Sequence, residues 1–316
     1  MEGYLRGYYG YKNFGDELLF FGVVKQLFTK YPLTKLFVSV GNVSRMEDRV
    51  WENYRDLLTE KQLKSLKFIN TKQHKYKIIT HLINFLWLGK YKKTFKFFGW
   101  WEVLSDERPF PHDGRNIPLL FDYSVQKKQF ALLGGIGKIR KPRTEMLYRH
   151  LLPKAERIIV RDRDSYQIAK KFNPENTVLY QDFAQETIES FKPKVQSSKP
   201  KYILININKQ MVNHENVTKI KDFCAKYPDH KKIFFPCDMN DDTHCFLFIK
   251  KYISDLEDYD WTAHPLSQSL SLFYHADAGI WARLHFLLPL KLYDKPIVAI
   301  PYADKINKLI SSGTRN

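Results

Sequence analysis

The chain has 316 residues, of which 44% are hydrophobic and 27% charged, a composition that indicates a globular protein and excludes a disordered one. Its length exceeds the size at which one hydrophobic core usually divides, so we expect two domains. The net charge of +17 favours anionic partners, which include acidic small molecules, anionic lipid and nucleic acid.

The cysteine content and the absence of targeting patterns indicate a compartment. Three cysteines are too few for a disulfide framework, which suggests a reducing environment. The first residues lack the regions of a signal peptide. The longest apolar run, 78–88, contains polar residues and is too short to span a bilayer. We therefore expect a cytoplasmic protein.

The first strand and helix are joined by an unusual loop. An apolar strand at 4–9 ends in glycines, and the loop carries Asn13 and Gly15 before Asp16 opens an apolar helix. Glycines let the backbone approach a ligand closely, and free N–H groups at a helix start attract anions. The pattern predicts a substrate-binding turn. The dinucleotide fingerprint G-x-G-x-x-G is absent.

Strands and helices alternate along the rest of the chain. In the first half we expect strands at 4–9, 35–40, 129–133, 157–160 and 177–180, with helices at 16–30, 144–152 and 165–172. A stretch rich in Pro, Ser and Lys, 192–201, is typical of a linker. Beyond it we expect strands at 202–207, 232–235, 278–281 and 297–300, with helices at 215–227, 243–254, 286–292 and from 304. This alternation predicts two α/β domains with parallel sheets, 1–191 and 202–316, that face each other across a cleft.

Residues 61–100 form a basic, aromatic insertion in the first domain. They include ten lysines, nine aromatic residues and no Asp or Glu. One interpretation is a solvated basic face over a local core. The other, which we favour, is a surface for an anionic membrane, where each lysine contributes about 1 kcal/mol. Single-stranded nucleic acid is less favoured because the aromatic residues are interleaved with Ile and Leu.

Several polar residues lie at the predicted carboxyl ends of strands, where open α/β sheets bind ligands. In the first domain Gly134 and Gly135 follow a strand in a predicted loop whose N–H groups suit an anion. Arg161 follows the next strand, and Asp164 or Ser165 is suited to cap the helix after it. The alternative role for Arg161 is a structural ion pair with the neighbouring Asp162.

In the second domain Arg283 and His285 leave a strand two residues apart. Arginine can clamp a carboxylate or phosphate bidentately, and histidine suits proton transfer near neutral pH. A lone histidine here would also fit a helix cap or a core position. A shared site is favoured by six residues at strand ends or helix starts: Asn13, Asp16, Arg161, Arg283, His285 and Lys305.

Metal and nucleophile motifs are missing from the sequence. Residues 237–245 contain Cys, Asp and His without the spacing of a zinc site, so we expect no metal, and Asp241 or Asp242 should cap the following helix. The nucleophile elbow, Walker A and kinase motifs are also absent.

Taken in order, these motifs resemble the polysaccharide pyruvyltransferases, which form pyruvate ketals on sugars. The matching stretches are Gly7-Tyr8-Tyr9-Gly10, Asn13-Phe14-Gly15-Asp16-Glu17, Leu132-Leu133-Gly134-Gly135, Arg161-Asp162-x-x-Ser165, Asp182-Phe183-Ala184, Arg283-Leu284-His285, and Pro296 to Tyr302 with Lys305. The family often has glycine where Ile136 stands and proline where Phe183 stands. The resemblance implies two Rossmann-like domains, similar to the GT-B glycosyltransferase architecture.

The resemblance also implies substrates and residue roles. The donor would be phosphoenolpyruvate, used as a co-substrate without a cofactor or metal. Its carboxylate and phosphate would be bound by Arg161, Arg283, Lys305, Gly134 and Gly135. The acceptor would be a saccharide, held by Asn13, Asp16 and Tyr9, and linked to a polyprenyl diphosphate at the cytoplasmic face of the inner membrane. His285 would act as the general acid, with Arg283 and Asp16 as further catalytic residues.

Two other functions stay open at this point. A glycosyltransferase of the same architecture would use a nucleotide sugar and release a nucleotide. A non-catalytic module would bind anionic lipid or nucleic acid through residues 61–100.

Overall fold

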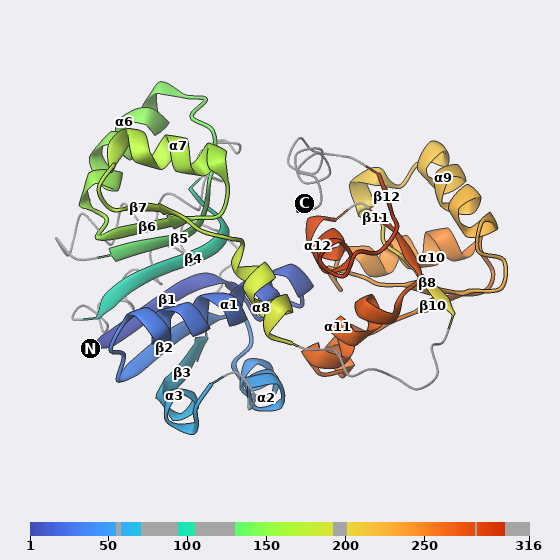
Figure 1. Ribbon diagram of the computed structural model, residues 1–316, viewed down its shortest axis with the longest axis horizontal. Coiled ribbons are helices and arrows are strands. Elements are labelled where there is room, and N and C mark those ends of the chain that lie inside the picture. Colours follow the sequence, from blue (N-terminus) through green and yellow to red (C-terminus); the bar gives the residue numbers. More distant parts are fainter. Residues whose placement is uncertain (55–57, 71–93, 105–129, 192–200, 282, 301–316) are drawn as a thin grey trace. The chain divides into compact units, whose positions relative to one another are not determined.

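A computed structural model describes residues 1–54, 58–70, 94–104, 130–191, 201–281 and 283–300. The chain forms two units, each with one parallel sheet (Figure 1). The first unit contains Met1–Tyr11 and Asp16–Thr187, and the second contains Lys12–Gly15 and Ile188–Asn316. The short segment Lys12–Gly15, which joins the first strand to α1 and includes the first two residues of that helix, therefore belongs to the second unit.

The first unit has a seven-stranded sheet in the order β3-β2-β1-β4-β5-β6-β7, and every neighbouring pair is parallel. Its strands are β1 (Glu2–Tyr9), β2 (Lys35–Val40), β3 (Leu66–Asn70), β4 (Phe95–Leu104), β5 (Phe130–Ile136), β6 (Arg157–Val160) and β7 (Thr177–Leu179). Its helices are α1 (Phe14–Lys30), α2 (Val43–Tyr54), α3 (Glu60–Ser65), α6 (Pro142–Leu151), α7 (Arg163–Phe172) and α8 (Phe183–Ser190).

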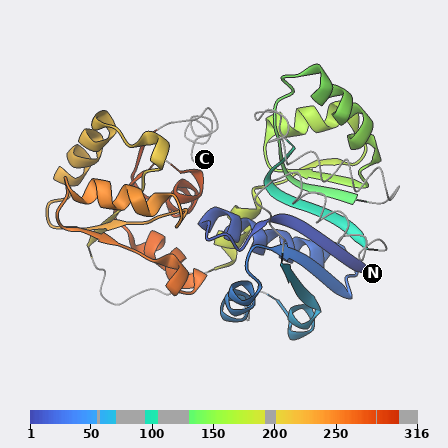
Figure 2. The ribbon, with the colours of Figure 1, turned by 180° about the vertical axis from the view of Figure 1, so that it is seen from behind.

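The second unit repeats the pattern with five parallel strands in the order β10-β9-β8-β11-β12. The strands are β8 (Tyr202–Ile205), β9 (Lys231–Phe234), β10 (Leu256–Asp258), β11 (Ala278–Trp281) and β12 (Ile297–Ala299). The helices are α9 (His214–Ala225), α10 (Asp242–Lys250), α11 (Leu266–His275) and α12 (Leu284–Leu292). Figure 2 shows the strands of both sheets from behind.

The central strands are nearly continuous apolar segments. All seven residues of β5 and all four of β8 are buried, as expected for parallel strands that helices cover on both faces. The core of the second unit combines residues of β8 and β11 with the inner faces of α9 and α10. The alternation of the sequence therefore predicted the α/β class correctly, with two parallel sheets.

The basic insertion contains β3 and the start of β4, two strands that the sequence did not lead us to expect. Lys96, in β4, is only 2% exposed, and its Nζ donates to Thr94 Oγ1 at 3.1 Å and lies 4.7 Å from the centre of the Tyr4 ring. Phe97 and Phe98 on the same strand are buried. The prediction of a surface patch is therefore wrong for this end of the insertion. Residues 71–93, with six of its ten lysines, lie outside the described residues.

Candidate functional site

The strand order of the second unit reverses between β8 and β11, and open α/β sheets bind ligands at the carboxyl ends of strands beside such a reversal. Asn206 follows β8, and Arg283 and His285 follow β11. The turn after β9 carries Cys237 and Asp238. The second sheet therefore gathers polar groups at the edge where its topology favours a site.

The segment Lys12–Gly15 is fixed to the turn after β9 by backbone pairing. Asn13 and Asp238 form an antiparallel bridge. The Phe14 amide donates to the Cys237 carbonyl at 2.7 Å, and the Met239 amide donates to the Lys12 carbonyl at 3.1 Å. The predicted substrate-binding turn is thus part of the second unit rather than an independent loop.

Phe14 anchors this segment in the core of the second unit. Its ring is fully buried and lies 4.9 Å from Phe235, 5.5 Å from Trp261 and 5.8 Å from Phe273, measured between ring centres. Aromatic contacts of this kind contribute about 0.5–1.5 kcal/mol each beyond the area they bury. The apolar anchor therefore holds Asn13 and Gly15 in place on either side of it.

Arg283 forms an ion pair with Asp242, the first residue of α10. Both Nε and Nη2 of Arg283 donate to Oδ1 of Asp242, at 3.0 and 2.6 Å. The arginine side chain is 22% exposed and the carboxylate is fully buried. Burial alone would lower the pKa of Arg283, but the Asp242 carboxylate outweighs it and raises that pKa, so the guanidinium stays charged.

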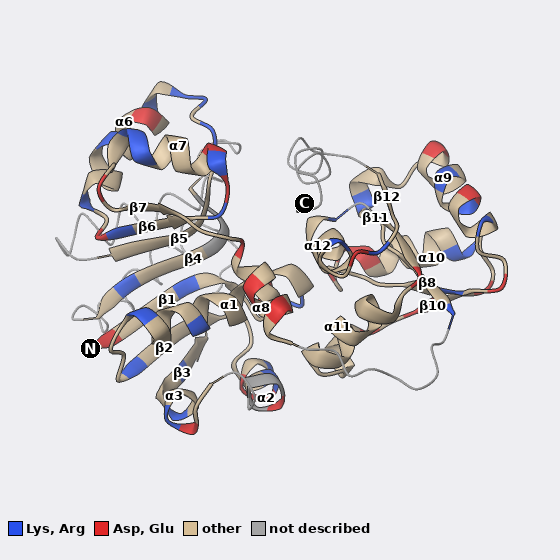
Figure 3. Ribbon diagram, in the orientation of Figure 1, with Lys and Arg blue, Asp and Glu red and all other residues tan. Residues whose placement is uncertain are grey.

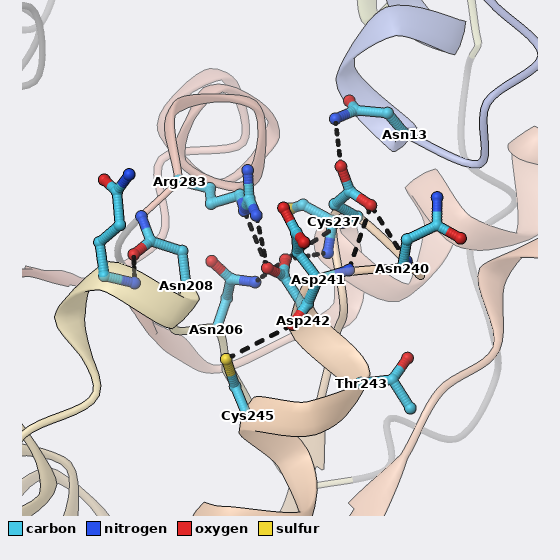
Figure 4. A network of polar contacts seen from close by, with 12 residues as sticks. Asn13, Asn206, Asn208, Cys237, Asn240, Asp241, Asp242, Thr243, Cys245 and Arg283 are labelled. Carbon is cyan, nitrogen blue, oxygen red and sulfur yellow. Dashed lines mark hydrogen bonds and ion pairs between the residues drawn. The ribbon is translucent and has the colours of Figure 1, made fainter. Parts of the chain in front are cut away.

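The other oxygen of Asp242 holds the turn after β9 (Figure 4). Oδ2 accepts from the backbone amides of Cys237 and Asp238, at 3.0 and 3.1 Å, and from Asn206 Nδ2 at 3.4 Å. Burial raises the pKa of the Asp242 carboxyl, and the Arg283 guanidinium opposes that rise. The carboxylate is thus surrounded by donors that favour its ionised form.

Asp238 connects this network to the first loop. Its Oδ2 accepts from Asn13 Nδ2 at 3.2 Å, and its Oδ1 accepts from the amides of Asn240 and Asp241. The prediction that Asp241 or Asp242 caps α10 is wrong. Asp241 occupies the N-cap position without a side-chain hydrogen bond, and Asp242 turns back toward the preceding residues.

His285 lies in the first turn of α12, and its ring packs against the backbone of Gly15. A Cβ atom on Gly15 would lie 1.7 Å from Nδ1 of His285. Only glycine leaves space for the imidazole here. The structure therefore brings together two predicted regions, the first loop and the Arg-Leu-His stretch, in one unit.

In the first unit, Arg161 is held by carboxylates. Its Nη1 lies 2.9 Å from Asp182 Oδ2, and its Nε lies 3.8 Å from Asp162 Oδ2. The closer partner is Asp182, which belongs to one of the stretches that resemble the family. The cap of α7 is also different from the prediction, because Asp162, rather than Asp164 or Ser165, accepts from the Ser165 amide.

Two predictions in the first unit need correction. Tyr9 is 1% exposed and its hydroxyl donates to the Gly99 carbonyl, so we remove it from the expected acceptor-binding residues. Burial raises its pKa strongly, with a smaller contribution from the Asp16 charge. Gly134 and Gly135 lie inside β5, paired with β4, so the loop predicted there is wrong.

The remaining predicted residues are placed as follows. Asp16 is half-buried in the first turn of α1, next to the fully buried Glu17, which pairs with Arg45 and Arg49 of α2. Lys305 lies outside the described residues. Among the residues that the structure describes, no group of three or more His, Cys, Asp or Glu could hold a metal ion.

Comparisons with solved structures show a shared fold. The chain is similar to the UDP-GlcNAc 2-epimerase from Neisseria meningitidis, with a TM-score of 0.68 and 10% identity over 99% of this chain and 86% of that one. The S. aureus MnaA–UDP co-structure has a TM-score of 0.68 and 10% identity, over 99% of this chain and 83% of that one. The UDP-N-acetylglucosamine 2-epimerase from Rickettsia bellii has a TM-score of 0.63 and 13% identity, over 94% of this chain and 78% of that one.

These identities support the fold alone, which is GT-B-like with two parallel-sheet α/β domains. No curated protein matches the chain. A family model described as polysaccharide pyruvyl transferase matches residues 13–304, which include Asn13 and the Arg283–His285 stretch. The chain belongs to the polysaccharide pyruvyl transferase family and is a pyruvyltransferase enzyme.

Proposed function

We propose that the enzyme transfers the pyruvyl group of phosphoenolpyruvate to two hydroxyls of a saccharide, forms a cyclic ketal and releases phosphate. The observation that carries this proposal is the state of Arg283. Two of its five N–H donors bind Asp242, and among the described residues the other three make no hydrogen bond. A partly exposed arginine with a fixed plane and three available donors suits a carboxylate or phosphate.

His285 is the proposed general acid. Its proton goes to the methylene carbon of phosphoenolpyruvate, which becomes a methyl group, while a sugar hydroxyl forms a C–O bond to the neighbouring carbon. The bond from that carbon to the phosphate oxygen breaks, and phosphate leaves with the electron pair. A second hydroxyl then closes the ketal. Of the two hydroxyl protons, one restores His285 and one leaves with phosphate.

Other residues have proposed supporting roles. Arg161 and Lys305 would bind the remaining charge of the donor, a small trianion that one arginine paired with Asp242 cannot neutralise. Asn13 and Asp16 would orient the acceptor diol, and Asp16 would pass one hydroxyl proton on to the departing phosphate. The scheme uses phosphoenolpyruvate as a co-substrate and needs no cofactor or metal.

We also propose that the acceptor is a lipid-linked precursor of a cell-surface polysaccharide, such as a capsule or exopolysaccharide, at the cytoplasmic face of the membrane. Support comes from residues 71–93, with six lysines and no acidic residue. On α7 and α9, by contrast, basic and acidic residues are interspersed (Figure 3). Across the described part of the chain, no helix has the length and apolarity needed to cross a membrane.

A nucleotide-sugar transferase is the second candidate. It is favoured by two of the similar solved structures, one with bound UDP and one with bound UDP-GlcNAc. Fold likeness at this identity does not carry a substrate from one protein to another.

The test is incubation of the purified enzyme with phosphoenolpyruvate and a panel of lipid-linked saccharides. We expect release of phosphate together with an acceptor mass gain of one pyruvate less one water. His285→Ala should lower the rate by about 10²–10⁴, the usual contribution of a positioned acid. Release of UDP from a UDP-sugar, with no phosphate from phosphoenolpyruvate, would support the second candidate instead.

A further inference from the structure

Asp242 bonds Arg283 through one oxygen and the turn after β9 through the other. Among the residues that the structure describes, Oδ1 accepts from the arginine alone, whereas Oδ2 accepts from Cys237, Asp238 and Asn206. Asp238 of that turn also accepts a hydrogen bond from the side chain of Asn13. One buried carboxylate thus fixes the direction of the guanidinium and the position of the first loop.

We propose that Asp242 is a positioning residue, which orients Arg283 toward the anionic donor and holds Asn13 at the same edge of the sheet. This inference rests on the proposed function. Asp242 does not touch substrate in this scheme. Its role is to keep the guanidinium plane fixed before the donor arrives, so that little side-chain freedom is lost when the donor binds.

The chemistry of the network explains why a carboxylate is needed. Each partner of the Asp242 side chain in the described part of the chain is a donor, so both of its oxygens must accept. An asparagine there has one acceptor and one NH₂ group. In one orientation the NH₂ faces the guanidinium of Arg283, and in the other it faces the amides of Cys237 and Asp238. Either orientation breaks one half of the network.

The ion pair with Asp242 fixes the orientation of the Arg283 guanidinium but also cancels its charge. Asp242 neutralises Arg283, so this arginine attracts the donor mainly through its directed N–H groups. The additional attraction must come from other cations. A lysine at 283 would keep the charge of the pair but lose the planar fork, and should therefore replace arginine poorly.

The test compares the wild-type enzyme with Asp242→Asn in phosphoenolpyruvate titration calorimetry and in steady-state kinetics. We expect at least about a tenfold loss of donor affinity, because a guanidinium that is no longer held in place must be ordered when the donor binds. The matched control is Asp241→Asn, which removes the same charge from an exposed neighbour whose side chain caps nothing. The control should bind the donor as the wild type does.

A double-mutant cycle separates positioning from a general structural effect. If Asp242 acts through Arg283, then Asp242→Asn should cost little further donor affinity in an Arg283→Ala enzyme. If the two losses add in full, Asp242 does not act through Arg283 and the proposal is overturned. Donor affinity of Asp242→Asn equal to that of the wild type would overturn it as well.

Arg283→Lys tests the same geometry without removing the buried carboxylate, should Asp242→Asn fail to fold. We expect its KM for phosphoenolpyruvate to rise about tenfold or more, and an unchanged KM contradicts the positioning role. A wild-type enzyme that neither binds nor turns over phosphoenolpyruvate would refute the proposed function and this role with it. An active wild type with an unaffected Asp242→Asn would refute only the role of Asp242.

Discussion

The imidazole of His285 lies so close to the backbone of Gly15 that the two residues exclude any side chain between them. A Cβ on Gly15 would meet Nδ1, Cγ and Cε1 of His285 at 1.7, 2.3 and 2.6 Å. The two residues are far apart in the sequence and meet because Phe14 is anchored in the core of the second unit. Glycine is therefore required at position 15 because any larger residue would collide with His285, the proposed acid.

Gly15→Ala should displace the ring of His285 and lower kcat by about 10² or more, since the acid would no longer reach the donor. Alanine favours a helix over glycine by about 1 kcal/mol, so the first turn of α1 itself should not be weakened. The checks are kcat and the thermal unfolding temperature, with Thr29→Ala on the same helix as control. Unchanged kcat would show that His285 can move without consequence.

Arg161→Ala should lower both stability and donor affinity. The change leaves Asp182, 17% exposed, without its partner at 2.9 Å, and we expect a loss of about 1–3 kcal/mol in the free energy of unfolding. If Arg161 also binds the donor, the Kd for phosphoenolpyruvate should rise about tenfold or more. Urea unfolding and calorimetry measure the two effects separately.

The neighbouring Arg163→Ala is the matched control for Arg161, because Arg163 is exposed. Arg163→Ala should change neither the free energy of unfolding nor the Kd for phosphoenolpyruvate measurably. A destabilised Arg161→Ala enzyme with normal donor affinity would assign Arg161 a purely structural role with Asp182.

Most of the fold was predictable because buried parallel strands are short apolar runs bounded by turns. Three strands, β3, β4 and β10, were not expected, and the last two show where that signal fails. In β4 the apolar pattern is interrupted by Lys96. This lysine is buried because Tyr4 and Thr94 contact its ammonium group, which the local sequence does not reveal. In β10 three residues include two acidic ones, and only Leu256 is buried. Pairing with a neighbouring strand, rather than composition, defines both.

The candidate site was predictable only in part. Arg283 and His285 were identified because both directly follow a strand. Asp242 was assigned to a helix cap, since its neighbours in the sequence favour that role and its real partner is 41 residues away. Its one available signal was a pair of adjacent aspartates before an apolar helix, which does not distinguish a cap from a buried ion pair.

The three cysteines should be unreactive in the folded protein. Burial raises the pKa of Cys224 and of Cys245 to about 11, and raises that of Cys237 strongly. Thiolate is the reactive form, so at pH 8 each native thiol should react far more slowly than a free cysteine. Titration with a chromogenic disulfide should detect none quickly in the native protein and three after unfolding. Rapid reaction of one native thiol would contradict this prediction.

Membrane binding should depend on the lysines of residues 71–93 and not on Lys96. Changing Lys90, Lys92 and Lys93 to Gln should weaken sedimentation with anionic liposomes at low salt, because each lysine contributes about 1 kcal/mol near such a surface. Binding of the wild type should fall as salt is raised, since the Debye length is only about 8 Å at physiological ionic strength.

Two controls define this experiment. Changing the exposed Lys221, Lys226 and Lys251 to Gln removes the same charge and should leave binding nearly unchanged. Lys96→Gln should instead lower the unfolding temperature, because it removes the buried ammonium that contacts Thr94 and Tyr4. If all three sets of substitutions weaken binding equally, net charge alone explains the attraction. If the wild type binds neutral and anionic liposomes alike, or neither, residues 71–93 have no electrostatic role at the membrane.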